Sequence, residues 1–381
     1  MTHGKIFLKY ITLILLGICM LTACGKVSDA ENNSTSEATN VTENSSSTEA
    51  IDVTENSSST EAIVNLNPDK IATDEPSTAV ERHGALSVQG AHLVDQNGEN
   101  VQLYGMSTHG LGWYPQFVNY DTFRTLRDDW NTNCVRLALY TAESNGYCTG
   151  GDKDALKALV TTGIDYATSL GMYVIVDWHI LSDQDPNVYK EDSKTFFDEI
   201  SATYADYDNI LYEICNEPNG YATWDSIKSY ADEVIPVIRA NDSNAVIIVG
   251  TPTWSQDIDK AAASPLEYDN ILYALHFYAG THKDDLRNRL DTCANNGLPI
   301  FVSEFGTCDA SGNGANDFDS ASKWLELLDQ HQISYCSWNL ANKNESSSVL
   351  KSSTTAVSDW AEDDLSESGR WIRDYFQKKS E

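Results

Sequence analysis

The sequence has 381 residues, enough for one large domain with an appendage or for two domains of ordinary size. Its 57 acidic and 25 basic side chains give a net charge of -32, which disfavours nucleic acids and anionic membranes as partners. The eight cysteines include no C-x-x-C pair and no cluster with histidines. We therefore predict no metal, no cofactor and no particular disulfide pairing.

The first 24 residues have the layout of an export signal. Lys5 and Lys9 precede an apolar run at residues 10–21 that is too short to span a bilayer comfortably. The sequence "LTAC" at residues 21–24 resembles the lipobox of bacterial lipoproteins. The resemblance implies a signal peptide at residues 1–23, lipidation of Cys24, and an extracellular protein anchored to the bacterial membrane. The alternative is an ordinary signal peptide with a coincidental cysteine.

Residues 24–80 have the composition of a spacer. The segment is rich in Ser, Thr, Asn and Glu, and "VTENSSSTEAI" occurs at residues 41–51 and again at 53–63. Such a polar, acidic repeat without aromatic residues cannot bury enough apolar surface to offset the entropy lost on ordering. We predict a disordered linker here and a catalytic domain at residues 84–379.

The pattern of the domain is that of alternating strands and helices. A stretch around Asn97 and Gly98 predicts a short hairpin before the first barrel strand, at the bottom of the fold. Apolar strands are predicted at 102–106, 134–140, 172–178, 210–215, 245–250, 271–276, 300–305 and 335–339, and helices at 121–130, 152–170, 193–204, 224–240, 283–295, 317–330 and 369–378. Eight strands with crossover segments predict a (β/α)8 TIM barrel. A doubly wound open sheet is the alternative, but no Gly-rich phosphate loop follows the first strand.

Polar and aromatic side chains gather at the predicted carboxyl ends of the strands. The catalytic face of a TIM barrel is built from these ends, so side chains from several strands are expected to meet there. Any one of them alone is explained by packing or by an ion pair. The candidates are Arg136, Tyr140, His179, Asn216, Glu217, His276, Tyr278, Glu304 and Trp338.

Two of these residues, Glu217 and Glu304, come from strands on opposite sides of the predicted barrel. Glycoside hydrolysis needs such a pair, one carboxyl group protonated and one ionised. If Arg136 reaches Glu304 it holds that carboxylate ionised, whereas Glu217 beside neutral groups keeps a raised pKa and acts as the acid. Asn216 is placed to meet the sugar 2-hydroxyl, and His276 to orient Glu304 or bind the sugar.

The motifs resemble those of glycoside hydrolase family 5, and most closely its bacterial endoglucanase subfamily. They are "NEP" at 216–218, "HFY" at 276–278, "SEFG" at 303–306, "WNLANKNESS" at 338–347, "STHGLGWYP" at 107–115 and "VIVDWHI" at 174–180. The resemblance implies that Glu217 is the acid/base and Glu304 the nucleophile of a retaining double displacement. It also implies sugar contacts from Arg136, His109, His179, Asn216, His276, Tyr278, Lys343 and Glu345.

An open groove lined with aromatic rings suits the apolar faces of pyranose sugars. Trp113, Trp254, Trp338 and Tyr140 are the candidates for stacking, with simple packing as the alternative for Trp254. We expect an endo-β-1,4-glucanase acting on cellulose and also on mixed-linkage β-glucan, and a monomer. Mannan, xylan and xyloglucan remain alternative substrates, and a non-catalytic glucan-binding surface protein is the alternative from another class. A metal-dependent hydrolase is disfavoured because no carboxylates stand in ligand spacing beside the histidines.

Overall fold

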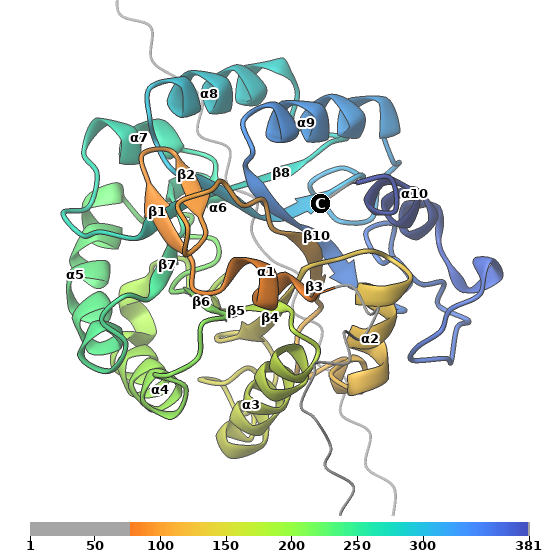
Figure 1. Ribbon diagram of the computed structural model, residues 1–381, viewed down its shortest axis with the longest axis horizontal. Coiled ribbons are helices and arrows are strands. Elements are labelled where there is room, and N and C mark those ends of the chain that lie inside the picture. The colour runs from red at the N-terminus through yellow and green to blue at the C-terminus, as the bar shows by residue number, and fades with distance from the viewer. Residues whose placement is uncertain (1–76, 380–381) are drawn as a thin grey trace, which may run out of the picture. The chain divides into compact units, whose positions relative to one another are not determined.

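Parallel strands close into a barrel (Figure 1). The computed structural model describes residues 77–379, so the predicted signal peptide, Cys24 and the linker up to residue 76 lie outside the described residues. The strands are β3 (Tyr104–Thr108), β4 (Cys134–Tyr140), β5 (Tyr173–His179), β6 (Ile210–Glu213), β7 (Val246–Val249), β8 (Ile271–Tyr278), β9 (Ile300–Gly306) and β10 (Ser334–Leu340). Their order is β10-β3-β4-β5-β6-β7-β8-β9, with β9 also pairing with β10. The predicted (β/α)8 barrel is confirmed.

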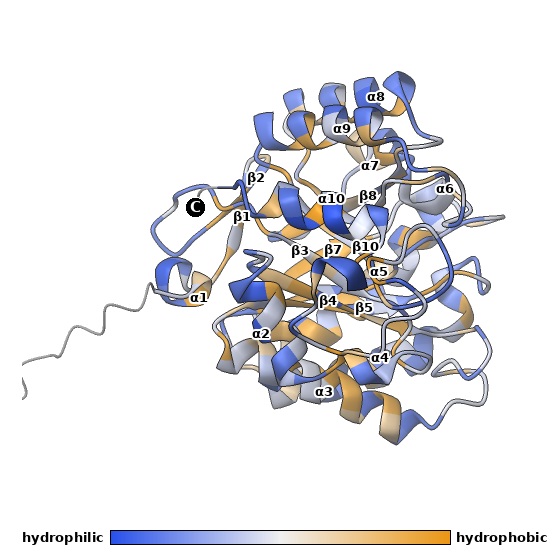
Figure 2. Ribbon diagram, turned by 90° about the vertical axis from the view of Figure 1, so that its right-hand side faces the viewer, coloured by the Kyte–Doolittle hydropathy of each residue, from blue (hydrophilic) through white to orange (hydrophobic). Residues whose placement is uncertain are grey.

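Amphipathic helices surround this barrel. The long ones are α2 (Tyr120–Asp128), α3 (Lys153–Ser169), α4 (Lys190–Thr203), α5 (Trp224–Asn241), α8 (Asp284–Asn295), α9 (Phe318–Gln330) and α10 (Glu367–Phe376). Short helical turns are α6 (Pro252–Ser255), α7 (Ile258–Ala263), η1 (Pro115–Phe117), η2 (Pro186–Tyr189) and η3 (Glu362–Asp364). Figure 2 shows the hydrophobic strands enclosed by helices with hydrophilic outer faces. Within residues 77–379, no helix combines the length and the apolar character needed to cross a membrane.

The amino-terminal elements cover one end of the barrel, as Figures 1 and 2 both show. Helix α1 (Ala79–His83) begins with a capping box between Thr78 and Glu81, and the Val80 amide donates to the Gly171 carbonyl oxygen at 3.1 Å. The helix covers the last two residues of the predicted linker and the three residues before the predicted start of the domain. The folded part therefore begins earlier than residue 84, because this cap and its contact fix the chain against the barrel.

The hairpin was predicted at the right place but with the wrong turn. Strands β1 (Ser87–Gln89) and β2 (His92–Val94) pair antiparallel across a turn at Gly90, which adopts a φ of 61°. Asn97 and Gly98 form a second tight turn, after which Asn100 makes a single bridge to Val94. The Gly90 turn sets the register because both strands of the ladder flank it directly.

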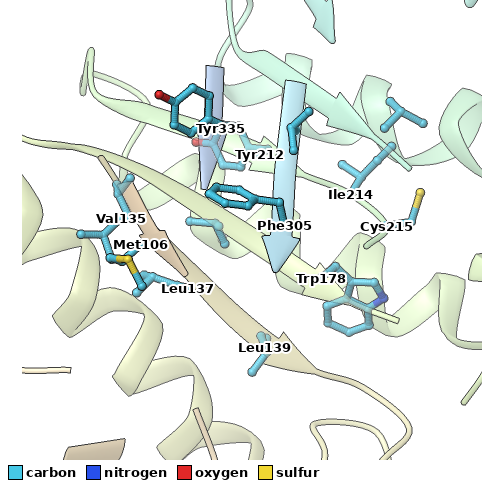
Figure 3. Packing of buried hydrophobic residues seen from close by; sticks show 14 of the residues in the cluster. Met106, Val135, Leu137, Leu139, Trp178, Tyr212, Ile214, Cys215, Phe305 and Tyr335 are labelled. Atoms are coloured by element: carbon cyan, nitrogen blue, oxygen red, sulfur yellow. The ribbon is translucent and has the colours of Figure 1, made fainter. Parts of the chain in front are cut away.

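Side-chain alternation along the strands produces two apolar regions. Outward-facing residues pack against the helices, and Figure 3 shows several of them, including Leu137, Trp178 and Tyr212. A second cluster joins the amino-terminal halves of the strands to the hairpin; its members include Leu86, Leu93, Leu103, Cys134, Tyr173, Ile175, Leu211, Val246, Ile248, Leu272, Phe301 and Cys336. The lower part of the barrel is thus a packed core closed off by the hairpin.

The cysteines within the described residues are free. Cys134 and Cys336 lie on either side of Gly105, and their sulfur atoms are 3.7 Å apart. A Cβ at position 105 would approach the Cys134 carbonyl oxygen to 1.9 Å, so only glycine fits between these strands. Burial raises the pKa of Cys134 well above its usual range, so this thiol is a packing group.

Candidate active site

A cleft of about 690 Å³ opens at the carboxyl ends of the barrel strands. Every site residue predicted within the described part of the chain lines it except Arg136 and Asn216, which lie buried beneath its floor. The lining residues that the sequence analysis did not single out are Glu143, Leu181, Gln256, His282, Ala310, Ser311 and Gly312. Most of these belong to loops, where no periodic pattern marks a side chain as facing a cleft.

Two glutamates face each other across this cleft. Glu217 follows β6 and Glu304 lies within β9, and a carboxylate oxygen of each lies within 4.8 Å of the other. Glu217 is 9% exposed and Glu304 3% exposed. Carboxyl groups of retaining glycosidases stand about 5–5.5 Å apart, whereas inverting enzymes leave roughly 6.5–9.5 Å for a water molecule. The separation therefore fits direct attack on the sugar by one carboxylate.

Glu304 is held by two donors. Nη1 of Arg136 donates to Oε2 at 3.2 Å, and the hydroxyl group of Tyr278 donates to Oε1 at 2.7 Å. The contact between Arg136 and Glu304 confirms the ion pair expected from the sequence. Burial and the charges of Glu304 and Glu217 raise the pKa of Tyr278 well above its usual range, so its phenol keeps the proton that it donates. The two donors fix the positions of both oxygens of Glu304.

Arg136 contacts three carboxylates rather than one. Its guanidinium lies 3.0 Å from Asp177, 2.7 Å from Glu213 and 3.2 Å from Glu304, and its side chain is fully buried. The sequence analysis missed Asp177 and Glu213. Asp177 is next to Trp178 in the sequence and Glu213 is next to Tyr212, and neighbouring residues of a strand point to opposite faces. Because Trp178 and Tyr212 face the helices, this alternation was the signal that places Asp177 and Glu213 inside the barrel.

Glu217 lies beside His276 rather than beside neutral groups. Nδ1 of His276 is 3.0 Å from Oε1 of Glu217. Burial lowers the pKa of His276, but its contacts with the carboxylates of Glu213 and Glu217 and the charge of Glu304 outweigh burial and raise it to about 9. The expectation that neutral neighbours surround Glu217 is therefore wrong. The reason is that β8 brings an imidazole, and β6 and β9 bring the carboxylates of Glu213 and Glu304, to the same floor, which residue spacing alone does not reveal.

A second chain of hydrogen bonds fixes Asn216. Nη2 of Arg136 donates to its Oδ1 at 2.6 Å, while its Nδ2 donates to Nε2 of His179 at 3.2 Å and to the Ile180 carbonyl oxygen at 3.1 Å. Burial and the charge of Arg136 lower the pKa of His179 to about 3, so the ring is neutral and donates from Nδ1 to Asp177 at 2.6 Å. Asn216 is thus held rigidly beneath the floor of the cleft, and its contact with a 2-hydroxyl group stays a prediction.

Aromatic rings form one wall of the cleft. The ring centroids of Trp113 and Tyr140 lie 4.6 Å apart, those of Tyr140 and His179 4.0 Å, and those of His109 and Trp338 5.1 Å. At one edge of this wall, Lys343 pairs with Glu345 at 2.6 Å, and Glu345 lies 3.7 Å from His109. The sequence-predicted residues thus form a continuous surface of rings edged by charged groups.

Trp254 stands apart on the opposite edge. It is 46% exposed and lies on a turn in which Thr253, Trp254 and Ser255 have φ values of 59°, 53° and 52°. Three consecutive left-handed residues other than glycine are unfavourable, so the surrounding structure must hold them. Ser255 donates to the Asn216 carbonyl oxygen at 2.7 Å, and the Trp254 amide donates to that of Pro218 at 3.0 Å. The turn is thereby fixed to the segment that carries Glu217, and its indole is not packed in the core.

Glu217, His276 and Glu304 also offer atoms spaced closely enough for a metal ion. Both nitrogens of His276 are engaged, however, by Glu217 at 3.0 Å and by Ser303 at 2.9 Å, and Glu304 is engaged by Arg136 and Tyr278. A metal ion would have to displace these contacts. Three ligands in this setting do not resemble a built metal site, and the absence of a metal stays a prediction.

A barrel with two facing glutamates at the ends of its strands defines a glycoside hydrolase. Residues 94–344 match the family model "Cellulase (glycosyl hydrolase family 5)". The chain belongs to glycoside hydrolase family 5.

Named relatives and solved structures agree with this family. The chain is 47% identical over 295 residues to Endoglucanase A of Butyrivibrio fibrisolvens, covering 77% of this chain and 68% of that protein. It is 49% identical over 293 residues to an endoglucanase of Clostridium saccharobutylicum, covering 76% and 64%. The catalytic domain of an endoglucanase from Thermobifida fusca, solved with cellotetraose, superposes with a TM-score of 0.76 at 41% identity, covering 79% of this chain and all of that one. The chain thus spans about two thirds of the length of the two sequence relatives.

Proposed function

We propose that the protein is an endo-β-1,4-glucanase that hydrolyses internal bonds of cellulose and of mixed-linkage β-glucan with retention of configuration. The observation that carries the proposal is the pair of carboxylates within 4.8 Å in an open cleft walled by aromatic rings. An open cleft admits a long chain at any point along its length, as endo-acting cleavage requires. The relatives named as endoglucanases support the same activity.

In the first step, Glu304 attacks the anomeric carbon as the bond to the leaving oxygen breaks, and Glu217 gives its proton to that oxygen. The product is an ester between the sugar and Glu304. The hydrogen bonds from Arg136 and Tyr278 orient Glu304 for attack. Because Nδ1 of His276 lies 3.0 Å from Oε1 of Glu217, the two side chains share the proton that the leaving oxygen receives.

In the second step, Glu217 removes a proton from water, and the resulting hydroxide attacks the same carbon. The ester bond breaks, Glu304 recovers its charge, and two inversions give net retention. The geometry requires no movement of Glu217 between its two roles, because it faces the cleft in both.

The test is the release of reducing ends from soluble β-1,4-glucan, mixed-linkage glucan, mannan and xylan. Glu304→Gln is the matched variant, since it keeps the size of the side chain and removes its charge. Cleavage of the glucans that disappears in the variant supports the proposal. Preference for mannan or xylan would keep the mechanism and change the substrate. A folded protein that cleaves none of the four, but binds glucan, would establish a non-catalytic binding protein instead.

Cellulose lies outside the cell, and the export signal predicted from the sequence would carry the enzyme there. We propose that Cys24 is lipidated and that the linker holds the barrel away from the membrane as a monomer. The protein would contact its polysaccharide and its lipid anchor but no nucleic acid, as its net charge of -32 indicates. Cys24→Ala should release the protein from the membrane fraction and abolish labelling by a radioactive fatty acid. Membrane attachment that persists in the variant would contradict the anchor.

A further inference from the structure

Glu213 is a buried carboxylate that the proposed reaction does not use. It ends β6, is inaccessible to solvent, and does not line the cleft. A carboxylate in such a place is strongly unfavourable unless both oxygens are paired. Each of its oxygens is in fact paired, and the two pairings lead to different catalytic glutamates.

Oε2 of Glu213 leads to the nucleophile. It accepts a hydrogen bond from Nε of Arg136 at 2.7 Å, and Nη1 of the same guanidinium donates to Glu304 at 3.2 Å. The guanidinium is planar and rigid, so a carboxylate that holds Nε also fixes the direction in which Nη1 points. Glu213 therefore orients Arg136 toward Glu304.

Oε1 of Glu213 leads to the acid/base. The hydroxyl group of Ser303 donates to it at 2.6 Å, and the same hydroxyl oxygen lies 2.9 Å from Nε2 of His276. A serine hydroxyl has one hydrogen, which Glu213 receives, so Ser303 must accept from His276. Nε2 is then always protonated, and Nδ1, 3.0 Å from Glu217, is the atom through which the ring exchanges a proton. Glu213 thus sets the tautomer of His276.

We infer that Glu213 is a positioning residue that couples the two catalytic glutamates, through Arg136 to Glu304 and through Ser303 and His276 to Glu217. This inference rests on the proposed function of the two glutamates. It assigns a role to Ser303 as well, since its hydroxyl group is hydrogen-bonded to both Glu213 and His276, whose direct contact is longer, at 3.8 Å.

The charges around Glu213 come from four other strands or their ends. Arg136 on β4, Asp177 on β5, His276 on β8 and Glu304 on β9 face it, and Glu217 lies beyond His276. Burial raises the pKa of Glu213, but Arg136 and His276 outweigh it and lower the pKa to about 2. Glu213 is therefore an acceptor throughout the working pH range, as the directions of both hydrogen-bond chains require.

The two chains of hydrogen bonds that start at Glu213 predict different pH profiles of kcat/KM for variants of Glu213 and Ser303. The acidic limb of kcat/KM reports ionisation of the nucleophile, and the basic limb reports loss of the proton shared by Glu217 and His276. Glu213→Gln removes an anion near both groups, so both limbs should move to lower pH, by about one unit each. Ser303→Ala leaves the Nε2 proton of His276 with no acceptor at hydrogen-bond distance, since Glu213 lies 3.8 Å away. Only the basic limb should therefore move to lower pH, which narrows the pH range of activity.

The measurement is kcat/KM against pH for an aryl β-cellobioside with a poor leaving group, on the purified wild-type protein and the two variants. Tyr212→Phe is the control, because Tyr212 precedes Glu213 on β6, faces the outer core, and has a buried hydroxyl group without a hydrogen-bond partner among the described residues. This variant should leave both limbs in place. Thermal unfolding establishes that each variant is folded.

Three results would overturn the coupling role. The pH profile of kcat/KM for Glu213→Gln could match that of the wild type, or it could differ in one limb only. The third such result is a Ser303→Ala profile in which both limbs shift. If Glu213→Gln does not fold, the Ser303→Ala profile alone decides, since an unmoved basic limb removes the link to Glu217. Failure of the proposed function is distinguishable, because the wild-type protein would then not cleave the cellobioside at all.

Discussion

The lower and upper halves of the barrel interior are built from the same strands but differ in chemistry. In the lower half, Tyr173, Ile175 and Leu211 pack with the hairpin into an apolar core. A step further along the same inward faces of β5 and β6 stand Asp177 and Glu213, both inaccessible to solvent. The lower half gains free energy from burial, whereas the upper half holds charges that are tolerated only because they are paired. The comparison indicates that the lower half stabilises the fold, whereas the upper half carries the charged groups that the reaction needs.

The outer face of the sheet shows no such division. Leu137, Leu139 and Trp178 pack against the helices beside both halves of the interior (Figure 3). The helices therefore support the charged half as firmly as the apolar half. This support keeps the buried ion pairs in fixed positions, which catalysis by preorganised charges requires.

The largest expected effect separates chemistry from stability. Glu304→Gln should lower kcat for β-glucan by about 10⁴-fold or more, because the nucleophile is lost while the cleft is retained. The midpoint of thermal unfolding should not fall, since the variant removes one carboxylate from a buried cluster rich in them. Reducing-end assays and calorimetry on the same preparation test both statements. A large loss of stability would mean that the upper half also holds the fold together through Glu304.

Removing the central cation should damage both properties. Arg136→Met leaves Asp177, Glu213 and Glu304 without their shared partner, and breaking such a buried pair costs about 3–5 kcal/mol. Leu211→Ala in the lower half should cost roughly 2–5 kcal/mol through a cavity. Urea unfolding measures both losses. The two variants should differ in the pH profile of kcat/KM, which should change in Arg136→Met and match the wild type in Leu211→Ala. A changed profile in Leu211→Ala would argue against the division of the barrel interior into a stabilising and a catalytic half.

The two buried histidines should make stability depend on pH with opposite signs. The pKa of His276 is raised from 6.5 to about 9, so its contribution is complete below pH 6.5 and is lost as the pH rises through 9. The loss is on the order of 3 kcal/mol. The pKa of His179 is lowered to about 3, so its neutral form stabilises the fold above pH 6.5, and this contribution is lost as the pH falls toward 3.

Unfolding free energies at several pH values test these signs. Relative to the wild type, His276→Asn should show a weaker decline between pH 6.5 and 9, whereas His179→Asn should show a weaker decline below pH 6.5. Parallel curves for the wild type and His276→Asn above pH 6.5 would contradict the charged state assigned to His276.

The smallest expected effect lies at the rim of the cleft. Trp254→Ala removes a half-exposed indole and should raise KM for soluble β-glucan by about tenfold, with little change in stability. Tyr221→Ala is a suitable control, because Tyr221 is 65% exposed and does not line the cleft. Equal kinetics in the two variants would remove Trp254 from the binding surface.

The sequence by itself determined the barrel and both glutamates. The signals were local: strands with a period of two, helices between them, and acids at the ends of apolar runs. Glu217 and Glu304 were therefore found without coordinates. The sequence also placed Arg136 and Glu304 on strands of one closed barrel, and the structure brings the two side chains into contact.

The tertiary structure alone decided the charged layer beneath the site. Asp177, Glu213 and Ser303 belong to strands that are distant in sequence, and only closure of the barrel sets the distances among them. The charge on His276 depends on those distances and on burial together, since each changes the pKa in an opposite direction. Local patterns specify which face of a strand a residue occupies, whereas the fold determines which charges that residue meets.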